Sequence, residues 1–253
     1  MPTSEEGPRA YGSQRKDGVL CVTRAGTEWL STGWNGGRIR DDRAFNISVP
    51  EGWSTRDLEG YVLERLSGAG FCDSNAGSVT APVLLTGVDL SHARGATCGP
   101  VTVYATAGVS NPAALPMEPR DGSLSDPGVT HDEPETPGTV NLIVGTTCRL
   151  DPGAFENLLA VVAEAKARTL LARTGFPGTT TDAIVIGHDP DARSRPYSGS
   201  ATRVGAATRA AVRDALCAAV DARYDAGDAT LPESVADATY GCRTDVRSTV
   251  FRP

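Results

Sequence analysis

The residue with the clearest capacity for chemistry is Lys166, which lies in a segment expected to be helical. The chain contains 22 arginines but only two lysines, so arginine is its usual cation. Lys166 follows Val162 by four residues and precedes Leu170 by four, which puts it on the apolar face of that helix. A lysine there indicates a need for a compact or titratable ammonium group. A structural role stays open, because a lysine stem can lie on apolar surface while its ammonium reaches water.

A second candidate is the polar run from Gly178 to Asp182, which consists of one glycine, three threonines and an aspartate. Clustered hydroxyls and a carboxylate at the start of a strand are typical of a polar site, although threonines also favour strand starts through their β-propensity. Glu164 is close to Lys166 in sequence but lies on a different face of the helix. Its expected partner is Arg168 at i+4, so the spacing favours a structural role for Glu164.

A strand, a helix and a second strand must position these residues. Residues 139–146 are mostly apolar and β-branched, which predicts the first strand. Asp151 followed by Pro152 is a helix start, and Gly175 predicts that the helix ends just before it. Residues 183–186 then predict the second strand.

The remaining segments predict an α+β domain with mixed β-sheets packed with helices in layers. Residues 19–23 and 28–32 predict a hairpin. The Asn35-Gly36 pair after them is either a tight turn or a place where backbone approaches a ligand. The other expected elements are three strands, at residues 44–49, 81–86 and 100–106, and two helices, at residues 54–67 with Ser54 as its cap and at residues 201–223.

We expect one domain over residues 18–224, between a flexible tail at residues 1–17 and an irregular tail at residues 225–253. Residues 112–137 hold six prolines and several acids. They are therefore expected to form a solvated loop or an active-site flap within that domain.

The composition excludes several classes of function. A net charge of −7 argues against a nucleic-acid partner, which requires a basic surface. No apolar segment is long enough to span a membrane and the N-terminal sequence is polar, so we expect a cytoplasmic protein without a membrane partner. Six scattered cysteines and three isolated histidines indicate neither a zinc site nor a disulfide framework, and no metal is expected. The acid excess with few lysines is typical of a salt-adapted proteome, while a GC-rich genome would also explain the arginines.

Several short segments rich in glycine, asparagine and threonine are weak signals alone but specific in this order. They are Asn35-Gly36-Gly37 with Ala44-Phe45-Asn46, Ala105-Thr106-Ala107-Gly108-Val109-Ser110-Asn111-Pro112, Gly138-Thr139-Val140-Asn141, Glu164-Ala165-Lys166, Gly178-Thr179-Thr180-Thr181-Asp182 and Tyr197-Ser198-Gly199-Ser200-Ala201-Thr202. Together they resemble the adenosylcobinamide amidohydrolase family of corrinoid salvage over residues 18–215. Pro177 is a departure, because the family pattern favours threonine there.

The resemblance implies hydrolysis of the amide that joins the aminopropanol arm to the corrin ring of adenosylcobinamide, giving adenosylcobyric acid and aminopropanol. The cobalt corrinoid is then the substrate and no cofactor is expected, while formation of a homo-oligomer stays open. The resemblance also implies a substrate pocket lined by polar residues from these segments, namely Asn35, Gly36, Gly37, Asn46, Asn111, Asn141, Glu164, Thr179 and Thr181.

Amide hydrolysis requires a nucleophile, donors for the oxyanion and an acid for the departing amine. Under the resemblance, we interpret Asp182 as the group that positions or deprotonates water, or that activates Thr139. Asn141 and nearby backbone amides would hold the oxyanion. Lys166 would supply charge or the proton for the leaving amine.

A bolder hypothesis starts from Gly138-Thr139, which follows the long loop and opens a strand. This layout is similar to that of self-cleaving N-terminal-nucleophile amidases and ornithine acetyltransferases, whose layered fold exposes a threonine or serine after internal cleavage. It implies a four-layer αββα form of the α+β fold and a new N-terminus at Thr139.

Three alternatives stay open. A non-catalytic corrinoid-binding protein would use the same pocket without releasing aminopropanol. An acyl-group transferase would exchange the amide with an added amine. In the plainest alternative, the chain is an α+β domain whose asparagines close turns and whose threonines fill strands.

Overall fold

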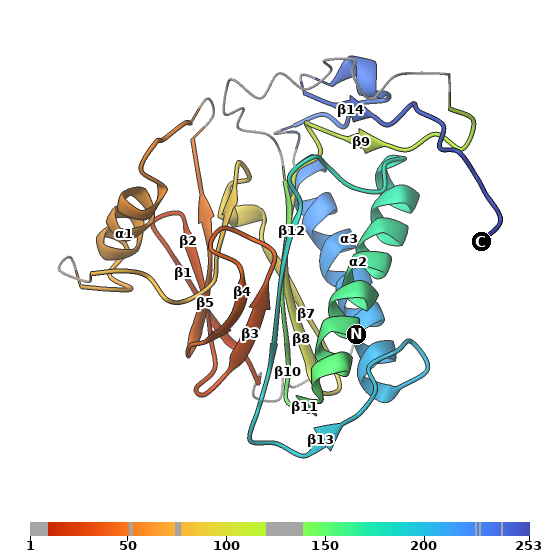
Figure 1. The fold of residues 1–253 in the computed structure, drawn as a ribbon. Helices are drawn as coiled ribbons and strands as arrows, with labels where there is room; N and C mark the ends of the chain where they lie inside the picture. Colours follow the sequence, from red (N-terminus) through yellow and green to blue (C-terminus); the bar gives the residue numbers. More distant parts are fainter. Residues whose placement is uncertain are drawn as a thin grey trace, which may run out of the picture.

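The chain folds into four layers, which are one helix, two β-sheets and a pair of helices (Figure 1). The computed structural model describes residues 10–50, 53–73, 77–119, 139–225, 227, 229–238 and 240–253. The first sheet has the strand order β1 (Gly12–Lys16), β2 (Val19–Thr23), β5 (Arg43–Ser48) and β6 (Val83–Thr86). The second has the order β4 (Gly37–Arg40), β3 (Glu28–Ser31), β12 (Ala183–His188), β10 (Val140–Thr146), β8 (Val101–Ala107) and β7 (Arg94–Cys98).

The helices cover the outer faces of the two sheets. The first sheet packs against α1 (Leu58–Gly68), and the second against α2 (Pro152–Thr174) and α3 (Arg203–Tyr224). The smaller elements are two strand pairs, β9 (Ala113–Ala114) with β14 (Cys242–Arg243) and β11 (Arg149–Leu150) with β13 (Ser194–Arg195), and the short turns Leu90–His92 and Val235–Asp237.

The alternation of side chains along the strands explains these layers. On β2, Leu20 packs between the two sheets, whereas the neighbouring Val19 packs on the α1 side. On β10, Ile143 faces the first sheet, whereas Leu142 packs against α2 and α3. Central strands that are apolar on both faces need cover on both sides, which an αββα arrangement supplies. The expected class is confirmed, since β10 pairs parallel with β12 and antiparallel with β8.

The hairpin expected at residues 19–23 and 28–32 is wrong, because β2 and β3 lie in different sheets. β2 pairs with β1 and β5, whereas β3 pairs with β4 and β12. The turn between them carries the chain across the core, so that Leu20 and Trp29 pack in the same cluster between the sheets.

The flexible tail expected at residues 1–17 is wrong for its C-terminal part. Residues 12–16 form β1 and pair with β2 along its whole length. Tyr11 is fully buried, and its hydroxyl donates a hydrogen bond to the carbonyl of Thr146 over 3.1 Å. This segment is therefore part of the core between the sheets.

The start of α1 also differs from expectation, because Asp57 caps it instead of Ser54. The Asp57 carboxylate accepts a hydrogen bond from the Gly60 amide over 2.9 Å. The two long helices begin and end close to their expected positions, and Gly175 ends α2 with a φ of +80°. Over the part of the chain that is described, no helix combines the length and apolar character needed to cross a bilayer.

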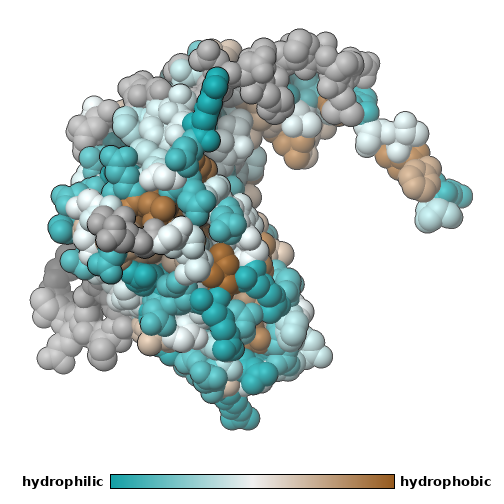
Figure 2. Space-filling view, turned by 60° about the vertical axis from the view of Figure 1, so that its left-hand side comes forward, coloured by the Kyte–Doolittle hydropathy of each residue, from teal (hydrophilic) through white to brown (hydrophobic). Residues whose placement is uncertain are grey.

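The segment at residues 225–253, expected to be irregular, contains one short turn and β14. Because β14 pairs with β9, it lies beside the start of the expected proline-rich loop. Residues 120–138, which form most of that loop, lie outside the described residues. Figure 2 shows the end of the C-terminal segment standing away from the body, where Val250 and Phe251 are 91% and 80% exposed.

Two glycines in register on the central strands make room for aromatic rings. Gly145 on β10 is the partner of Gly187 on β12, and a Cβ on either would lie 2.5 Å from the ring of Tyr11 or Trp29. Those two rings contact each other edge to face with 5.7 Å between their centroids. The neighbouring strands therefore have no space for a methyl group at these positions.

We expect Gly145→Ala to destabilise the protein by about 1–3 kcal/mol, because the methyl must displace the buried Tyr11 ring. Thermal or denaturant unfolding measures the change. Gly153→Ala is the control, since nothing lies within 4 Å of a Cβ at that exposed position on α2. Equal stability of the two variants would contradict this account of the core.

Candidate active site

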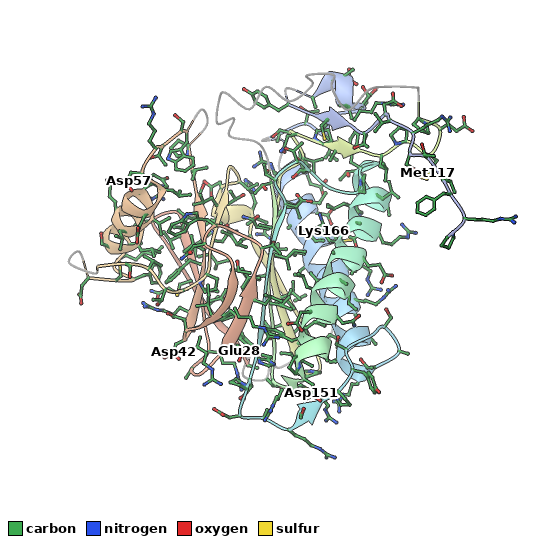
Figure 3. The ribbon with its side chains drawn as sticks, viewed as in Figure 1. Glu28, Asp42, Asp57, Met117, Asp151 and Lys166 are labelled. Atoms are coloured by element: carbon green, nitrogen blue, oxygen red, sulfur yellow. The ribbon has the colours of Figure 1, made fainter. Side chains whose placement is uncertain are left out.

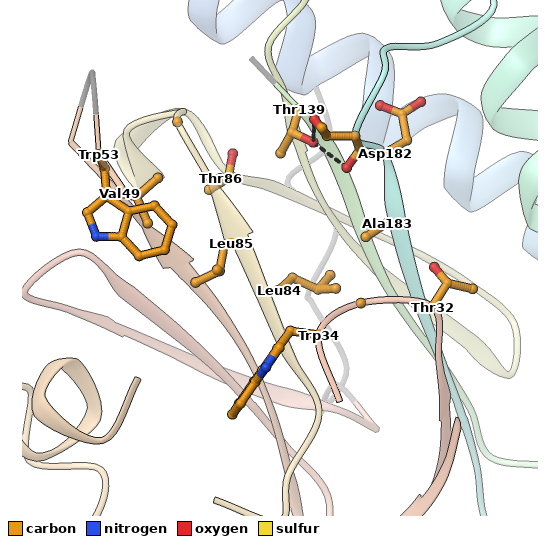
Figure 4. A pocket seen from close by; sticks show the side chains of 13 residues that line it. Thr32, Trp34, Val49, Trp53, Leu84, Leu85, Thr86, Thr139, Asp182 and Ala183 are labelled. Carbon is orange, nitrogen blue, oxygen red and sulfur yellow. Dashed lines mark hydrogen bonds between the residues drawn. The ribbon is translucent and has the colours of Figure 1, made fainter. Parts of the chain in front are cut away.

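A pocket of about 330 Å³ opens between the two sheets at the start of β10 and β12 (Figure 4). Its apolar wall comes from Leu84 and Leu85 on β6, from Val49 and Trp53 after β5, and from Trp34 in the turn between β3 and β4. Its polar wall comes chiefly from the second sheet and includes Thr139, Thr181 and Asp182, together with Thr32 and Thr86. An apolar pocket with a few convergent polar groups is typical of a small-molecule site.

Thr139 and Thr181 form a hydroxyl pair on the polar wall. The Thr139 hydroxyl donates to the Thr181 carbonyl over 2.7 Å, and its Oγ1 lies 2.9 Å from the Thr181 Oγ1 (Figure 4). Thr139 is only 3% exposed, so these contacts fix its side chain against the pocket. Thr139 comes just before β10 and is four residues from Ile143, which faces the space between the sheets. Because alternate residues of a strand share a face, Thr139 points the same way.

The carboxylate of Asp182 is bound by four donors. The Val140 amide donates to Oδ1 over 3.0 Å and the Thr179 amide donates to Oδ2 over 3.1 Å. The Thr179 hydroxyl also donates to Oδ1, and the Lys166 ammonium forms an ion pair with Oδ2. Lys166 and Asp182 are 12% and 9% exposed, so this ion pair is nearly buried. We call Asp182, Lys166, Thr179 and Val140 the Asp182 cluster.

The Asp182 cluster and the Thr139 hydroxyl lie on different faces of the second sheet. In Figure 4 the carboxylate of Asp182 points away from the pocket, toward the helices, although the residue lines the pocket. Alternation explains this, because Ile184, two residues later, packs in the cluster that contains α2 and α3. Gly178 is required beside it, since a Cβ there would lie 2.5 Å from Asp182 Oδ2 and 3.0 Å from Lys166 Nζ.

Asn46 and Asn141 link the two sheets in the buried space between them. Asn141 Nδ2 donates to Asn46 Oδ1 over 3.0 Å and to the Leu85 carbonyl over 2.8 Å. Asn46 Nδ2 in turn donates to the Thr106 hydroxyl over 3.1 Å. Both hydrogens of the Asn141 amide are thus engaged, so an oxyanion could be held by Asn141 only if one of these bonds broke.

Asn111 fastens the loop at residues 178–182. Its carbonyl accepts from the Thr180 amide over 3.2 Å, and its Nδ2 donates to the Thr180 hydroxyl over 2.6 Å and to the Thr181 hydroxyl over 3.4 Å. Asn111 is fully buried. It therefore helps to place Thr181 beside Thr139 without lining the pocket.

Two of the expected site segments lie away from these contacts. Asn35 is exposed with a φ of +50°, in the turn between β3 and β4 that also contains Gly36, and Gly37 is the first residue of β4. Glu164 is exposed on α2 and forms an ion pair with Arg209 on α3, so the partner expected at Arg168 was wrong. The pocket is instead lined by residues that we did not predict from the sequence, chiefly Trp34, Trp53 and Leu84. The sequence held one indication of these residues, because Trp34 and Trp53 are two of only three tryptophans in the chain.

The described histidines have structural environments. His188 is buried and stacks on Phe155 with 4.2 Å between ring centroids. Its Nδ1 accepts a hydrogen bond from the Leu150 amide over 2.9 Å, and desolvation by burial lowers the pKa of His188. His92 contacts the Ala222 carbonyl through Nδ1 over 2.8 Å, and His131 lies outside the described residues. Nowhere in the described ranges do three or more His, Cys, Asp or Glu side chains form a metal-binding group.

Comparison with known proteins gives strong sequence matches. An adenosylcobinamide amidohydrolase of Halobacterium salinarum is 55% identical over 237 residues, covering 94% of this chain and 97% of that protein. One of Methanosarcina mazei is 28% identical over 218 residues, covering 82% and 96%. The PH0078 protein of Pyrococcus horikoshii matches in structure with a TM-score of 0.39 and 13% identity, covering 82% of this chain and 78% of that one, and we draw nothing from this weak likeness.

The match to a family model extends over most of the chain. Residues 1–228 match the family model described as adenosylcobinamide amidohydrolase. This range contains the Thr139–Thr181 pair, the Asp182 cluster and every residue that lines the pocket. The chain therefore belongs to the adenosylcobinamide amidohydrolase family.

Proposed function

We propose that this protein hydrolyses the amide that joins the aminopropanol arm to the corrin ring of adenosylcobinamide. In the net reaction one water is consumed and the C–N bond breaks, so that the acyl carbon ends as a carboxylic acid and the nitrogen as an amine, giving adenosylcobyric acid and aminopropanol. Membership of the family supports this reaction. The structural observation that carries the proposal is the Thr139 hydroxyl, held by Thr181 on the wall of an apolar pocket.

The size of the pocket indicates which part of the substrate would enter. A volume of about 330 Å³ suits the aminopropanol arm and its amide but is too small for the corrin macrocycle. We propose that the arm enters between the sheets and the macrocycle stays at the mouth. Trp34 and Trp53 are both partly exposed and offer flat apolar surfaces to it. The cobalt corrinoid is thus a substrate in this proposal, and the reaction uses groups of the chain itself.

We assign nucleophilic attack to Thr139 and a positioning role to the Asp182 cluster. The Thr139 hydroxyl lines the pocket, whereas the Asp182 carboxylate points toward the helices (Figure 4). Asp182 nevertheless binds the amide of Val140, the residue next to Thr139. Lys166 holds the same carboxylate, so the pair would act by fixing the backbone on which the nucleophile stands.

Attack by the Thr139 hydroxyl requires a base that takes its proton. Among the described residues, no carboxylate, imidazole or amine forms a hydrogen bond with this hydroxyl, whose partners are Thr181 atoms. An α-amine on Thr139 itself would supply a base within the same residue. We propose that cleavage of the peptide bond between residues 138 and 139 creates this amine.

The cleavage needs only groups of the chain and water. The Thr139 Oγ1 attacks the carbonyl carbon of residue 138, the C–N bond breaks, and the hydroxyl proton passes to the released amine. The ester that results is hydrolysed by water, which leaves a carboxylate on residue 138 and restores the Thr139 hydroxyl. Each later substrate amide would be attacked by the same oxygen, with the new amine taking the hydroxyl proton and passing it to the leaving nitrogen as the C–N bond breaks and aminopropanol departs. Water then hydrolyses the acyl ester on Thr139, which releases adenosylcobyric acid and restores the hydroxyl.

Mass spectrometry of adenosylcobinamide incubated with the pure protein tests the function. We expect adenosylcobyric acid and free aminopropanol in equal amounts. Binding of the corrinoid without release of aminopropanol would instead indicate a corrinoid-binding protein. Exchange of the amide with an added amine, in preference to hydrolysis, would indicate an acyl-group transferase.

A further inference from the structure

A second hollow, of about 870 Å³, lies at the other end of the second sheet from the Thr139 pocket. Thr147 and Cys148, which follow β10, contribute to its wall, whereas Thr139 precedes that strand. A seven-residue strand separates the two positions, which corresponds to about 23 Å. Figure 3 shows the same separation along α2, with Asp151 at the end near β13 and Lys166 toward the opposite end. The hollow is therefore separate from the proposed substrate pocket.

Three arginines from two segments line this hollow without an acidic partner. Arg193, Arg195 and Arg203 are all exposed, and none of them forms an ion pair with a residue of the described ranges. Asp151, which lies near β13, is bound by the Ser194 hydroxyl and not by an arginine. In a chain with a net charge of −7, three unpaired guanidinium groups around one concave surface form a local positive site.

The start of α3 adds backbone donors to the same wall. Arg203 and Val204 are the first two residues of this 22-residue helix, and both line the hollow. The Thr202 hydroxyl accepts from the Gly205 amide, which leaves the earlier amides of the first turn outside the helix ladder. The positive end of the helix dipole therefore points to the side where the arginines gather.

Tyr197 lines the hollow with an aromatic ring that is not packed in the core. It is 74% exposed, and it opens the segment at residues 197–202 that is not part of the Thr139 pocket. Other residues of that segment have structural tasks, since Ser198 is buried and donates to the Ala154 carbonyl, while Thr202 caps α3. An exposed ring beside guanidinium groups offers a surface on which a flat ligand group can stack.

We propose that this hollow binds a phosphate-bearing anion, with Arg193, Arg195, Arg203 and the first turn of α3 holding the phosphates. Planar guanidinium groups bind phosphate oxygens in pairs, which a set of converging arginines does better than one alone. Tyr197 would stack on a ring attached to the phosphates. The chemistry is that of an oligophosphate, from an inorganic or a nucleotide source, and it is independent of the proposed hydrolysis.

Isothermal titration calorimetry with pyrophosphate and with ATP, at one fixed ionic strength, tests the site. The full chain is compared with R193Q/R195Q/R203Q and with the control R56Q/R168Q/R252Q. The control removes the same charge from three exposed arginines that line no part of this hollow and form no ion pair with described residues. We expect the first variant to bind both probes about 10-fold or more weakly, and the control to bind within about 2-fold of the parent.

Tyr197→Ala separates the two sources of the ligand. Weaker binding of ATP with unchanged binding of pyrophosphate supports a nucleotide, whereas no effect on either supports an inorganic anion. The proposal is overturned if the parent binds neither probe, or if the two triple variants lose affinity equally, because binding would then follow net charge alone. Aminopropanol release by R193Q/R195Q/R203Q is expected to equal that of the parent, so this outcome does not depend on the proposed hydrolysis.

Discussion

Replacement of Thr139 by valine is expected to lower the release of aminopropanol at least about 10³-fold, because it removes the proposed nucleophile while keeping the side-chain shape. Thr139→Ser, which keeps a hydroxyl at the same place, is the matched control and should retain measurable turnover. The buried hydroxyl donates one hydrogen bond to Thr181, so Thr139→Val should cost only about 1 kcal/mol of stability. Thermal unfolding separates that small loss from the large loss of turnover.

The same variants test the internal cleavage. Intact-mass measurement of the active parent should give two chains, the second beginning at Thr139, and Thr139→Val should give one. A single uncleaved chain in fully active protein would contradict the cleavage but not the nucleophile. Normal turnover by Thr139→Val would contradict both, and it would return Asp182-activated water to consideration.

Thr181→Val provides a graded comparison at the same wall of the pocket. The substitution removes the Thr181 hydroxyl, which contacts Thr139 and Asn111. It keeps the Thr181 backbone carbonyl, which accepts the hydrogen bond from the Thr139 hydroxyl. A loss of turnover much smaller than that of Thr139→Val is therefore consistent with a partner that orients the nucleophile. Comparison of kcat with KM would show whether the loss lies in the chemical step.

The local part of the site was accessible from sequence. The signals for Asp151, Pro152 and Gly175 place α2 correctly, and the helical spacing puts Lys166 on its inner side. Because a strand–helix–strand unit is contiguous in sequence, the return of the chain to Asp182 beside Lys166 follows from short-range rules. The two residues were therefore identified together, although their ion pair lies on the helix side of the sheet and not in the pocket.

The assignment of strands to the two sheets, and the packing of one sheet on the other, could not be predicted from the sequence in this way. Turn residues at 24–27 show that the chain bends, but they do not show whether it returns to the same sheet, and the predicted hairpin failed for that reason. Asn46 and Asn141 are 95 residues apart, and their contact exists only because two sheets pack face to face. Trp34 and Trp53 line the pocket for the same reason, since neither is near Thr139 in sequence. Long-range packing thus decides which residues meet at the site.

The sharpest test of the Asp182 cluster is a comparison of two ion pairs on the same helix. Asp182→Asn is expected to destabilise the protein by about 3–5 kcal/mol, because it leaves the Lys166 ammonium nearly buried without its partner. Lys166→Met should cost less, since the carboxylate keeps the Val140 amide and both donors of Thr179. The control is Glu164→Gln, which breaks the exposed pair with Arg209 and should cost less than about 1 kcal/mol.

Turnover by the folded variants then separates positioning from proton transfer. If Lys166 and Asp182 fix the backbone beside Thr139, Lys166→Met should keep the pH dependence of kcat and lose no more than about 10-fold in rate. If Lys166 donates the proton to the leaving amine, its loss should cost about 10²–10⁴-fold and remove one limb of the pH–rate profile. The second result would contradict the positioning role, whereas Glu164→Gln should leave the profile unchanged in either case. The direction in which the Asp182 carboxylate points, away from the pocket and onto the Val140 amide, favours the first result.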